Sequence, residues 1–291
     1  MWQVMSLQTV QAIAALLRYH WWIQIAERRG RHAVPITPCG YAVGTGIFTP
    51  AEIHQMQTGI TETINRIARG FLTPYETSCP ELPFAERLER VAQRDRAYAV
   101  ALVHSVFADA HHDPRIAGLA EHPRLMDYVT RLVAPRRVTG QVIRIRVNIP
   151  SFPQTRSPWH QDATDHRSTV VMACWIPLVD ATHANGTLEV LPGVYEEPYP
   201  HQQTVDGKFY VPQEVLPATS PLTLACPAGD VLFLDRFLLH RTLPNQTTTI
   251  RWSIVMWVKA QRHNFLEVAQ TMPQAVMPHP LIETSPDQYP H

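Results

Sequence analysis

Residues 141–149 have the sequence Gln-Val-Ile-Arg-Ile-Arg-Val-Asn-Ile, in which branched side chains occupy many of the positions. Branched residues favour β-strands because their stiff side chains fit a pleated surface. Similar short runs continue to Val258, with turn residues between them. These further predicted strands cover residues 169–178, 187–191, 222–226, 231–234 and 251–258. The chain after Pro135 is therefore predicted to be mainly β.

The chain before Pro135 differs, because its apolar residues recur at helical spacing. Thr49-Pro50-Ala51-Glu52 supplies a helix N-cap, a first-turn proline and a reciprocal carboxylate, and the helix that follows is expected to end at Gly70. Further helices are expected over residues 7–25, 84–108 and 124–134. Helices followed by strands predict a mainly β fold with N-terminal α-helices, in which a helical layer supports a sandwich or jelly roll.

The length of 291 residues fits one large domain. We expect a helical support region over residues 1–135 and a β core over residues 136–262. The remaining residues, 263–291, contain five prolines, which prevent regular structure. They are predicted to form an irregular tail.

Charge and composition narrow the classes of partner. Lysine plus arginine number 25, and aspartate plus glutamate also number 25, so no overall positive field would attract nucleic acid or anionic lipid. Neither a signal peptide nor an apolar run long enough to cross a membrane is predicted. The four cysteines are widely spaced, which predicts reduced thiols and a cytoplasmic location. The oligomeric state stays open.

His160-Gln161-Asp162 is the stretch with the clearest chemical signal. Residues two apart on an extended chain point to the same face, so an imidazole and a carboxylate can bind one ion. Such a short motif is weak alone, but Gly229-Asp230 leads later to His240, and Arg251 follows eleven residues beyond. Two imidazoles and one carboxylate leave positions open on a metal, as in non-heme Fe(II) oxygenases. A planar guanidinium can bind the distal carboxylate of a 2-oxoacid.

Four blocks, in order, resemble the phytanoyl-CoA dioxygenase-like branch of the Fe(II)/2-oxoglutarate-dependent oxygenases. The blocks are Trp159-His-Gln-Asp162, Asp180-Ala-Thr-His-Ala-Asn-Gly-Thr-Leu-Glu-Val-Leu-Pro-Gly193, Gly229-Asp230 before His240, and His240-Arg-Thr-Leu-Pro-Asn-Gln-Thr247 closing at Arg251. The second block departs from the family pattern, because Val194 and Tyr195 follow Gly193 where Ser-His is usual. Asp162 keeps the carboxylate that related halogenases replace with a small residue, which disfavours halogenation.

The resemblance implies a double-stranded β-helix, a cupin-like jelly roll, that binds Fe(II) through His160, Asp162 and His240. It also implies that 2-oxoglutarate chelates the metal while Arg251 binds its far carboxylate. Gln141 and Trp175 are expected as additional cosubstrate contacts. The expected enzyme is a non-heme iron dioxygenase that uses O2, releases succinate and CO2, and is stimulated by ascorbate. Hydroxylation of an unactivated C–H bond is the leading outcome, and desaturation or dealkylation would start from the same hydrogen abstraction.

The strand around Gln141 leaves open which of its faces points inward. Arg144, Arg146 and Asn148 share one face, and Gln141 shares the other with Ile143. If Gln141 points inward, the two arginines should face the helical layer or solvent. A β-bulge would reverse this arrangement.

The substrate is expected to be a small molecule, because a coenzyme A thioester would call for clustered cations near the pocket. The one dense basic stretch, residues 28–32, is far in sequence from the metal ligands. The resemblance favours a secondary metabolite and a role in natural-product biosynthesis. Loops are expected to line the entrance. At least two of five loop residues are predicted to contact substrate: Phe152, Trp159, Asp165, His166 and Tyr195.

Two other functions stay open at this point. A non-catalytic jelly-roll protein that binds or senses a metal could use the same three ligands, but it would not need Arg251. A zinc hydrolase could use them too, although the sequence offers no evident general-base motif.

Overall fold

The computed structural model describes residues 39–134, 136–193 and 195–261, which lie within one compact unit of the chain. The helix predicted over residues 7–25 and the tail predicted over residues 263–291 lie outside the described residues. The single-domain organisation expected for the whole chain therefore stays a prediction.

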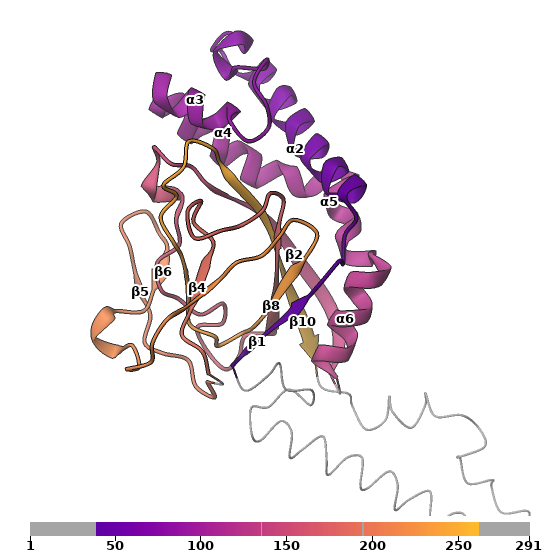
Figure 1. Cartoon of the computed structure of the whole chain (residues 1–291), viewed down its shortest axis with the longest axis vertical. Helices are drawn as coiled ribbons and strands as arrows, with labels where there is room; N and C mark the ends of the chain where they lie inside the picture. The colour runs from indigo at the N-terminus through magenta and orange to yellow at the C-terminus, as the bar shows by residue number, and fades with distance from the viewer. Residues whose placement is uncertain (1–38, 135, 194, 262–291) are drawn as a thin grey trace, which may run out of the picture. The chain divides into compact units, whose positions relative to one another are not determined.

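A five-stranded antiparallel sheet forms the centre of the described structure (Figure 1). Its longest pairing joins residues 251–261 to residues 137–148, from Arg251 opposite Asn148 to Gln261 opposite Arg137, with one register shift between Lys259 and Ala260. In spatial order the strands are β1 (Tyr41–Gly44), β8 (Val231–Asp235), β3 (Val170–Pro177), β10 (Arg251–Gln261) and β2 (Arg137–Asn148).

A second antiparallel sheet has three short strands. In spatial order they are β7 (Leu222–Leu224), β4 (Leu188–Val190) and β9 (His240–Thr242). The segment that follows β2 lies next to β9 at the edge of this sheet, where His160 and His240 form an isolated antiparallel bridge. The loop between β4 and β7 carries a small hairpin of β5 (Gln202–Gln203) and β6 (Phe209–Tyr210). Each of the six predicted strands overlaps one observed strand, whereas β1, β5, β6 and β9 lie outside the six predicted ranges.

Helices cover one face of the five-stranded sheet (Figure 1). The predicted capping box at Thr49 and Glu52 is confirmed, since each side chain accepts a hydrogen bond from the backbone N–H of the other residue. The single helix predicted over residues 84–108 is wrong. Asp95 has an extended backbone that ends one helix, and its carboxylate caps the next by accepting from the Tyr98 N–H. The α-helices are α2 (Pro50–Gly70), α3 (Arg87–Arg94), α4 (Arg96–Asp109), α5 (Pro114–Ala117) and α6 (Pro123–Val133), and the 3-10 helices are η1 (Tyr75–Ser78), η2 (Ala110–His112), η3 (Gly118–Glu121), η4 (Pro153–Thr155) and η5 (Gln213–Val215).

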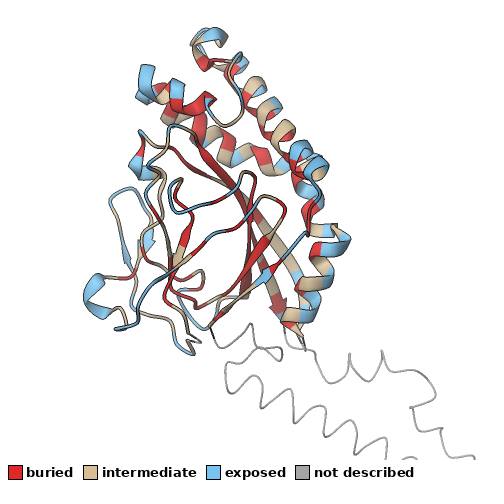
Figure 2. Ribbon diagram, in the orientation of Figure 1, coloured by how far each residue is buried: buried red, intermediate tan, exposed pale blue. Residues whose placement is uncertain are grey.

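Alternation along the strands creates two apolar cores, and the buried residues in Figure 2 follow the strands and the sheet-facing sides of the helices. On β10, Trp252 and Ile254 belong to the core shared with the helices. Val255 points to the opposite face and packs in the second core with Trp175 of β3 and Leu188 of β4. Burying each large apolar side chain contributes about 1.5–3 kcal/mol. The predicted combination of a mainly β structure with helices is confirmed, and its sheets are antiparallel. The site lies between the two sheets.

Candidate active site

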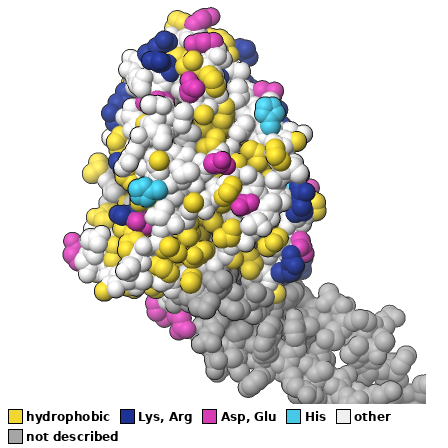
Figure 3. Space-filling view, viewed as in Figure 1, with side chains coloured by type: hydrophobic (Ala, Val, Ile, Leu, Met, Phe, Trp, Pro, Cys, Tyr) yellow, Lys and Arg dark blue, Asp and Glu magenta, His cyan; other side chains and the backbone are white. Residues whose placement is uncertain are grey.

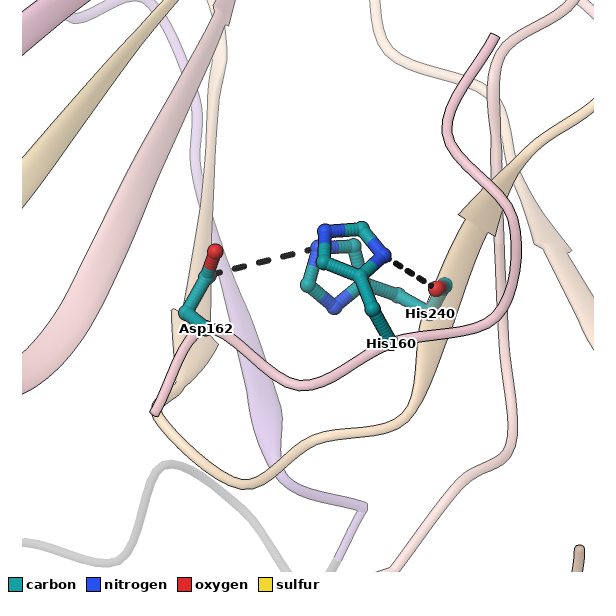
Figure 4. Close-up of side chains that lie close together, drawn as sticks. All are labelled: His160, Asp162 and His240. Carbon is teal, nitrogen blue, oxygen red and sulfur yellow. Dashed lines mark hydrogen bonds and ion pairs between the residues drawn. The ribbon is translucent and has the colours of Figure 1, made fainter. Parts of the chain in front are cut away.

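Three candidate metal ligands meet between the sheets. His160 lies in the segment after η4, and His240 begins β9. Their backbones exchange two hydrogen bonds, each 3.0 Å from nitrogen to oxygen, which hold the two imidazoles side by side with ring centroids 4.2 Å apart. Asp162 follows two residues after His160, and one potential ligand atom from each of the three residues lies within 4.8 Å of the others. Figure 4 shows the three side chains converging on one space.

Hydrogen bonds to the backbone orient both imidazoles. The Nδ1 atom of His160 lies 2.8 Å from the Pro158 carbonyl oxygen, and the Nδ1 atom of His240 lies 2.9 Å from that of Leu238. A carbonyl oxygen can only accept, so each Nδ1 carries the proton and each Nε2 keeps a lone pair. Burial, followed by the neighbouring His240, lowers the pKa of His160 to about 4, which keeps its ring neutral at pH 7.

The carboxylate of Asp162 is held by one oxygen only. Its Oδ1 atom accepts a 2.6 Å hydrogen bond from the indole N–H of Trp257 on β10. Its Oδ2 atom is buried without a hydrogen-bond partner among the described residues and lies 4.0 Å from Nε2 of His240. A buried carboxylate oxygen and two imidazole lone pairs form a set of acceptors that lacks a donor. This residue set fits a divalent metal ion, which would satisfy all three at once.

Gln161 fixes the backbone between the two ligands. Its side chain is 2% exposed and donates a 2.6 Å hydrogen bond to the Phe237 carbonyl oxygen, while its own oxygen accepts a 2.6 Å bond from the Tyr199 N–H. The Gln161 N–H also donates to Nε2 of His201, 3.2 Å away. These contacts send the Gln161 side chain away from the flanking ligands, as expected for alternating residues of an extended segment.

A cavity with about 510 Å³ of empty space, part of it open to solvent, includes these three ligands. The other residues that line the cavity, both apolar and polar, come mainly from strands of the two sheets. The lining residues are Arg146, Val147, Thr155, Ser157, His160, Asp162, Ala173, Trp175, Leu188, Leu234, His240, Thr242, Arg251, Val255 and Trp257.

Arg251 is a buried cation in this cavity, with 1% of its surface exposed. Its Nε donates to the Gly186 carbonyl oxygen at 3.2 Å, and its Nη1 donates to the Ser253 hydroxyl at 2.7 Å. The guanidinium carbon lies 5.2 Å from the ring centroid of Trp175. Burial lowers the pKa of Arg251 to about 9, so it is still charged at neutral pH. None of the described residues supplies a carboxylate partner for it, which leaves it available for an anion.

The structure brings Trp175 into the cavity, as predicted for a cosubstrate contact, but it does not bring Gln141 there. The face of β2 that contains Gln141 packs towards the helices, where its amide lies 3.9 Å from the sulfur of Met126 in α6. Ile145 on the same face belongs to the helix-side core. The expected cosubstrate contact by Gln141 is therefore wrong, and of the two orientations that the sequence left open the strand adopts the one in which Arg146 lines the cavity.

None of the five loop residues expected to contact substrate is among the residues that line this cavity. Phe152 packs in the helix-side core, and Trp159 packs in a separate apolar cluster. Asp165 accepts hydrogen bonds from the backbone of its own turn, and His166 is exposed and pairs with Glu197. The Tyr195 hydroxyl donates to the Leu191 carbonyl oxygen. These residues are close to the candidate ligands in sequence, but their side chains do not line the cavity, because each packs in an apolar cluster or forms a hydrogen bond elsewhere.

Sequence reasoning missed three kinds of lining residue. Trp257 reaches Asp162 across 95 positions of sequence, which no local pattern reveals. The hydroxyl-bearing residues Ser157 and Thr242 lie beside the histidines in two different segments. Arg146 was noted only as part of an alternating strand, and the alternation alone could not say which face turned inward.

The phytanoyl-CoA dioxygenase (PhyH) family model matches residues 39–253, which include the ligands and Arg251. The chain belongs to this family. Its family makes it a non-heme iron, 2-oxoglutarate-dependent oxygenase, as the resemblance implied. The matched region spans most of the described residues, so the helices and both sheets belong to the family domain. No curated protein sequence matches the chain.

Solved structures of similar fold include the non-heme monooxygenase ThoJ in its apo form, with 19% identity, 77% of this chain and 75% of that chain covered, and a TM-score of 0.51. EctD from S. alaskensis, solved with 2-oxoglutarate and 5-hydroxyectoine, has 17% identity, coverage of 77% and 73%, and a TM-score of 0.49. The 2-oxoglutarate-dependent epimerase SnoN from nogalamycin biosynthesis has 20% identity, coverage of 81% and 83%, and a TM-score of 0.41. The likeness to ThoJ supports a shared fold.

Two surface observations bear on partners. Among the described residues, no helix is both long enough and apolar enough to span a membrane. On the face drawn in Figure 3, basic and acidic side chains are scattered among hydrophobic and uncharged ones. The expectation that nucleic acid is not a partner rests on composition and stays a prediction.

Proposed function

We propose that this oxygenase binds Fe(II) through His160, Asp162 and His240 and binds the far carboxylate of 2-oxoglutarate through Arg251. The acceptor-only cluster carries this proposal, because Oδ2 of Asp162 is buried without a partner beside two imidazole lone pairs. Two histidines and one carboxylate leave positions open for a cosubstrate and for O2. Arg251 supports the same assignment, since it is buried in the same cavity without a carboxylate partner among the described residues.

The residues around the ligands would prepare the site before any substrate arrives. The Pro158 and Leu238 carbonyl oxygens fix the imidazole tautomers, so that no proton must leave before a metal binds. Trp257 holds one oxygen of Asp162 and leaves the other free to coordinate. Bound Fe(II) would supply the electrons for O2 activation, coupled to conversion of 2-oxoglutarate to succinate and CO2, and ascorbate would keep the metal reduced.

The substrate that we propose is a small-molecule metabolite, oxidised at an unactivated C–H bond and most simply hydroxylated. A cavity lined by apolar side chains and a few polar ones is typical of small-molecule sites. The hydroxyls of Ser157 and Thr242 and the guanidinium of Arg146 offer polar contacts in addition to those assigned to the metal and cosubstrate. A role in natural-product biosynthesis is part of the same proposal.

We also propose that the two sheets form a double-stranded β-helix. The larger sheet has the order β8-β3-β10-β2 beside β1, and the smaller one has the order β7-β4-β9 followed by the segment at His160. From β2 to β10, successive segments therefore alternate between the larger and the smaller sheet, with one exception. The exception is β4 and β7, which follow one another apart from the small hairpin between them and both belong to the smaller sheet. This succession supports two sheets that face each other around the cavity.

The proposal predicts metal-dependent succinate formation. Purified protein with Fe(II), ascorbate and 2-oxoglutarate would be tested against a metabolite panel, with succinate and oxidised product measured together. His160→Ala and Asp162→Ala should abolish both products, whereas His54→Ala, at an exposed position on α2, should retain them. An anaerobic visible spectrum with Fe(II) and 2-oxoglutarate supplies a second readout. Absence of a metal-to-ligand charge-transfer band would reject the cosubstrate assignment and favour a metal-binding protein without oxygenase activity.

A further inference from the structure

A second guanidinium lies in the cavity beside the candidate metal ligands. Arg146 is on β2, opposite Ser253 of β10, and its side chain is among the cavity-lining groups. Its guanidinium carbon lies 5.4 Å from the ring centroid of Trp257, the residue whose indole N–H donates to Asp162. Arg146 therefore lies against the tryptophan that holds the carboxylate of Asp162.

Arg146 makes no hydrogen bond or ion pair with any residue in the described ranges. Two other arginines of the sheets have such partners: Arg251 donates to Gly186 and Ser253, and Arg241 pairs with Glu189. Burial lowers the pKa of Arg146, and the charge of Asp162 acts in the opposite direction. Arg146 is half-buried in the cavity wall, and a partly desolvated cation without a hydrogen-bonded partner would gain from an anion beside it.

Counting charges shows that the proposed metal and cosubstrate leave Arg146 uncompensated. Fe(II) with its charge of plus two, the Asp162 carboxylate, doubly charged 2-oxoglutarate and the Arg251 guanidinium together sum to zero. Arg146, half-buried in the cavity wall, then adds one positive charge. One further negative charge would make the cavity neutral.

We propose that Arg146 binds an acidic group, a carboxylate, of the substrate and so makes this oxygenase selective for organic acids. The proposal rests on the proposed function, because the charge count includes the metal and 2-oxoglutarate. A guanidinium suits this role because its planar N–H groups can form two parallel hydrogen bonds to one carboxylate. The contacts of the two arginines also separate their roles. Arg251 lies against Gly186, Ser253 and Trp175, whereas Arg146 lies against Trp257.

The test measures binding rather than turnover. Protein loaded with redox-inert Zn(II) and saturating 2-oxoglutarate would be titrated calorimetrically with hexanoate, phenylacetate and cinnamate, and with their uncharged primary amides. At least one acid should bind about tenfold more tightly than its amide, the ratio expected for about 1.4 kcal/mol from a charge-assisted hydrogen bond. Arg146→Gln should abolish the preference without changing amide affinity, and Arg146→Lys should restore part of it.

Arg144→Gln is the matched control, because Arg144 shares the strand and face of Arg146 but does not line the cavity. This variant should keep the acid preference. Equal affinity for acids and amides, no binding by any probe, or a preference that survives Arg146→Gln would each overturn the inference. Loss of Zn(II) affinity in Arg146→Gln with an unchanged acid-to-amide ratio would show a structural role through Trp257 and would also reject it.

Binding of 2-oxoglutarate is measured first in the same Zn(II)-loaded protein. If 2-oxoglutarate does not bind, the proposed function fails and the inference fails with it. If 2-oxoglutarate binds but the acid probes show no preference that depends on Arg146, only the inference fails. Loss of 2-oxoglutarate binding in Arg146→Gln would assign Arg146 to the cosubstrate and would overturn the role proposed here.

Discussion

Arg251 illustrates how one side chain can be prepared for an anion by its surroundings. Two of its nitrogens donate to Gly186 and Ser253, so the guanidinium is oriented before a cosubstrate binds. Replacing it by glutamine should raise the dissociation constant of 2-oxoglutarate about 10- to 100-fold, since hydrogen bonds to charged groups contribute about 1.5–3 kcal/mol. Calorimetry with Zn(II)-loaded protein would measure this change. Unchanged 2-oxoglutarate affinity would show that Arg251 is not its ligand.

Trp257 acts at the same scale through its bond to Asp162. Trp257→Phe removes the indole N–H and leaves both carboxylate oxygens without a fixed orientation. Metal affinity should fall about 10- to 100-fold, as is common when a hydrogen bond to a metal ligand is lost. A competition titration with a metal chelator would measure the affinity, and the unfolding midpoint of metal-free protein would serve as the control. Equal affinity in both proteins would contradict this role for Trp257.

At the scale of elements, the start of α2 is a self-contained unit. Thr49 and Glu52 cap the helix reciprocally, and the Glu52 carboxylate also contacts His122 and Arg124 of the segment that begins α6. Thr49→Ala should lower the free energy of unfolding by about 1 kcal/mol, because it leaves the Glu52 backbone N–H at the helix start without its acceptor. Urea unfolding would measure the change, and Thr58→Ala, at a half-buried position within the same helix, provides the comparison.

The same cap predicts a pH dependence. The Thr49 backbone N–H, together with His122 and other neighbours, lowers the pKa of Glu52 from 4.5 to about 2. A carboxyl whose pKa is lower in the folded state stabilises the fold above its unfolded pKa and loses this effect as pH falls. The free energy of unfolding of the wild type should therefore exceed that of Glu52→Gln by its largest amount at pH 7. The difference should shrink as the pH falls from 4.5 towards 2. Urea unfolding at several pH values would reveal a constant difference if the assignment were wrong.

At the scale of the whole molecule, a metal would join segments that are far apart in sequence. His160 and Asp162 follow β2, and His240 begins β9, so a bound ion would link them only in the folded state. A divalent metal at 100 times its dissociation constant should add about 2.7 kcal/mol of stability, which raises the unfolding temperature by about 5–10 °C. Asp162→Ala should abolish the increase, and Asp127→Ala, an exposed carboxylate on α6, should retain it. An equal increase in Asp162→Ala would place the metal elsewhere.

The sequence by itself determined the cap of α2, the approximate positions of six strands, and the candidate set of three metal ligands with Arg251, because each depends on local spacing or on a family motif. Only the tertiary structure decided which face of β2 turned inward. Period-two alternation is the same for both faces, and pairing with β10 together with packing on the helices turned Ile145 outward from the cavity and Arg146 into it. The bond from Trp257 to Asp162 likewise required the strands to be assembled, since side chains 95 positions apart meet only through long-range packing.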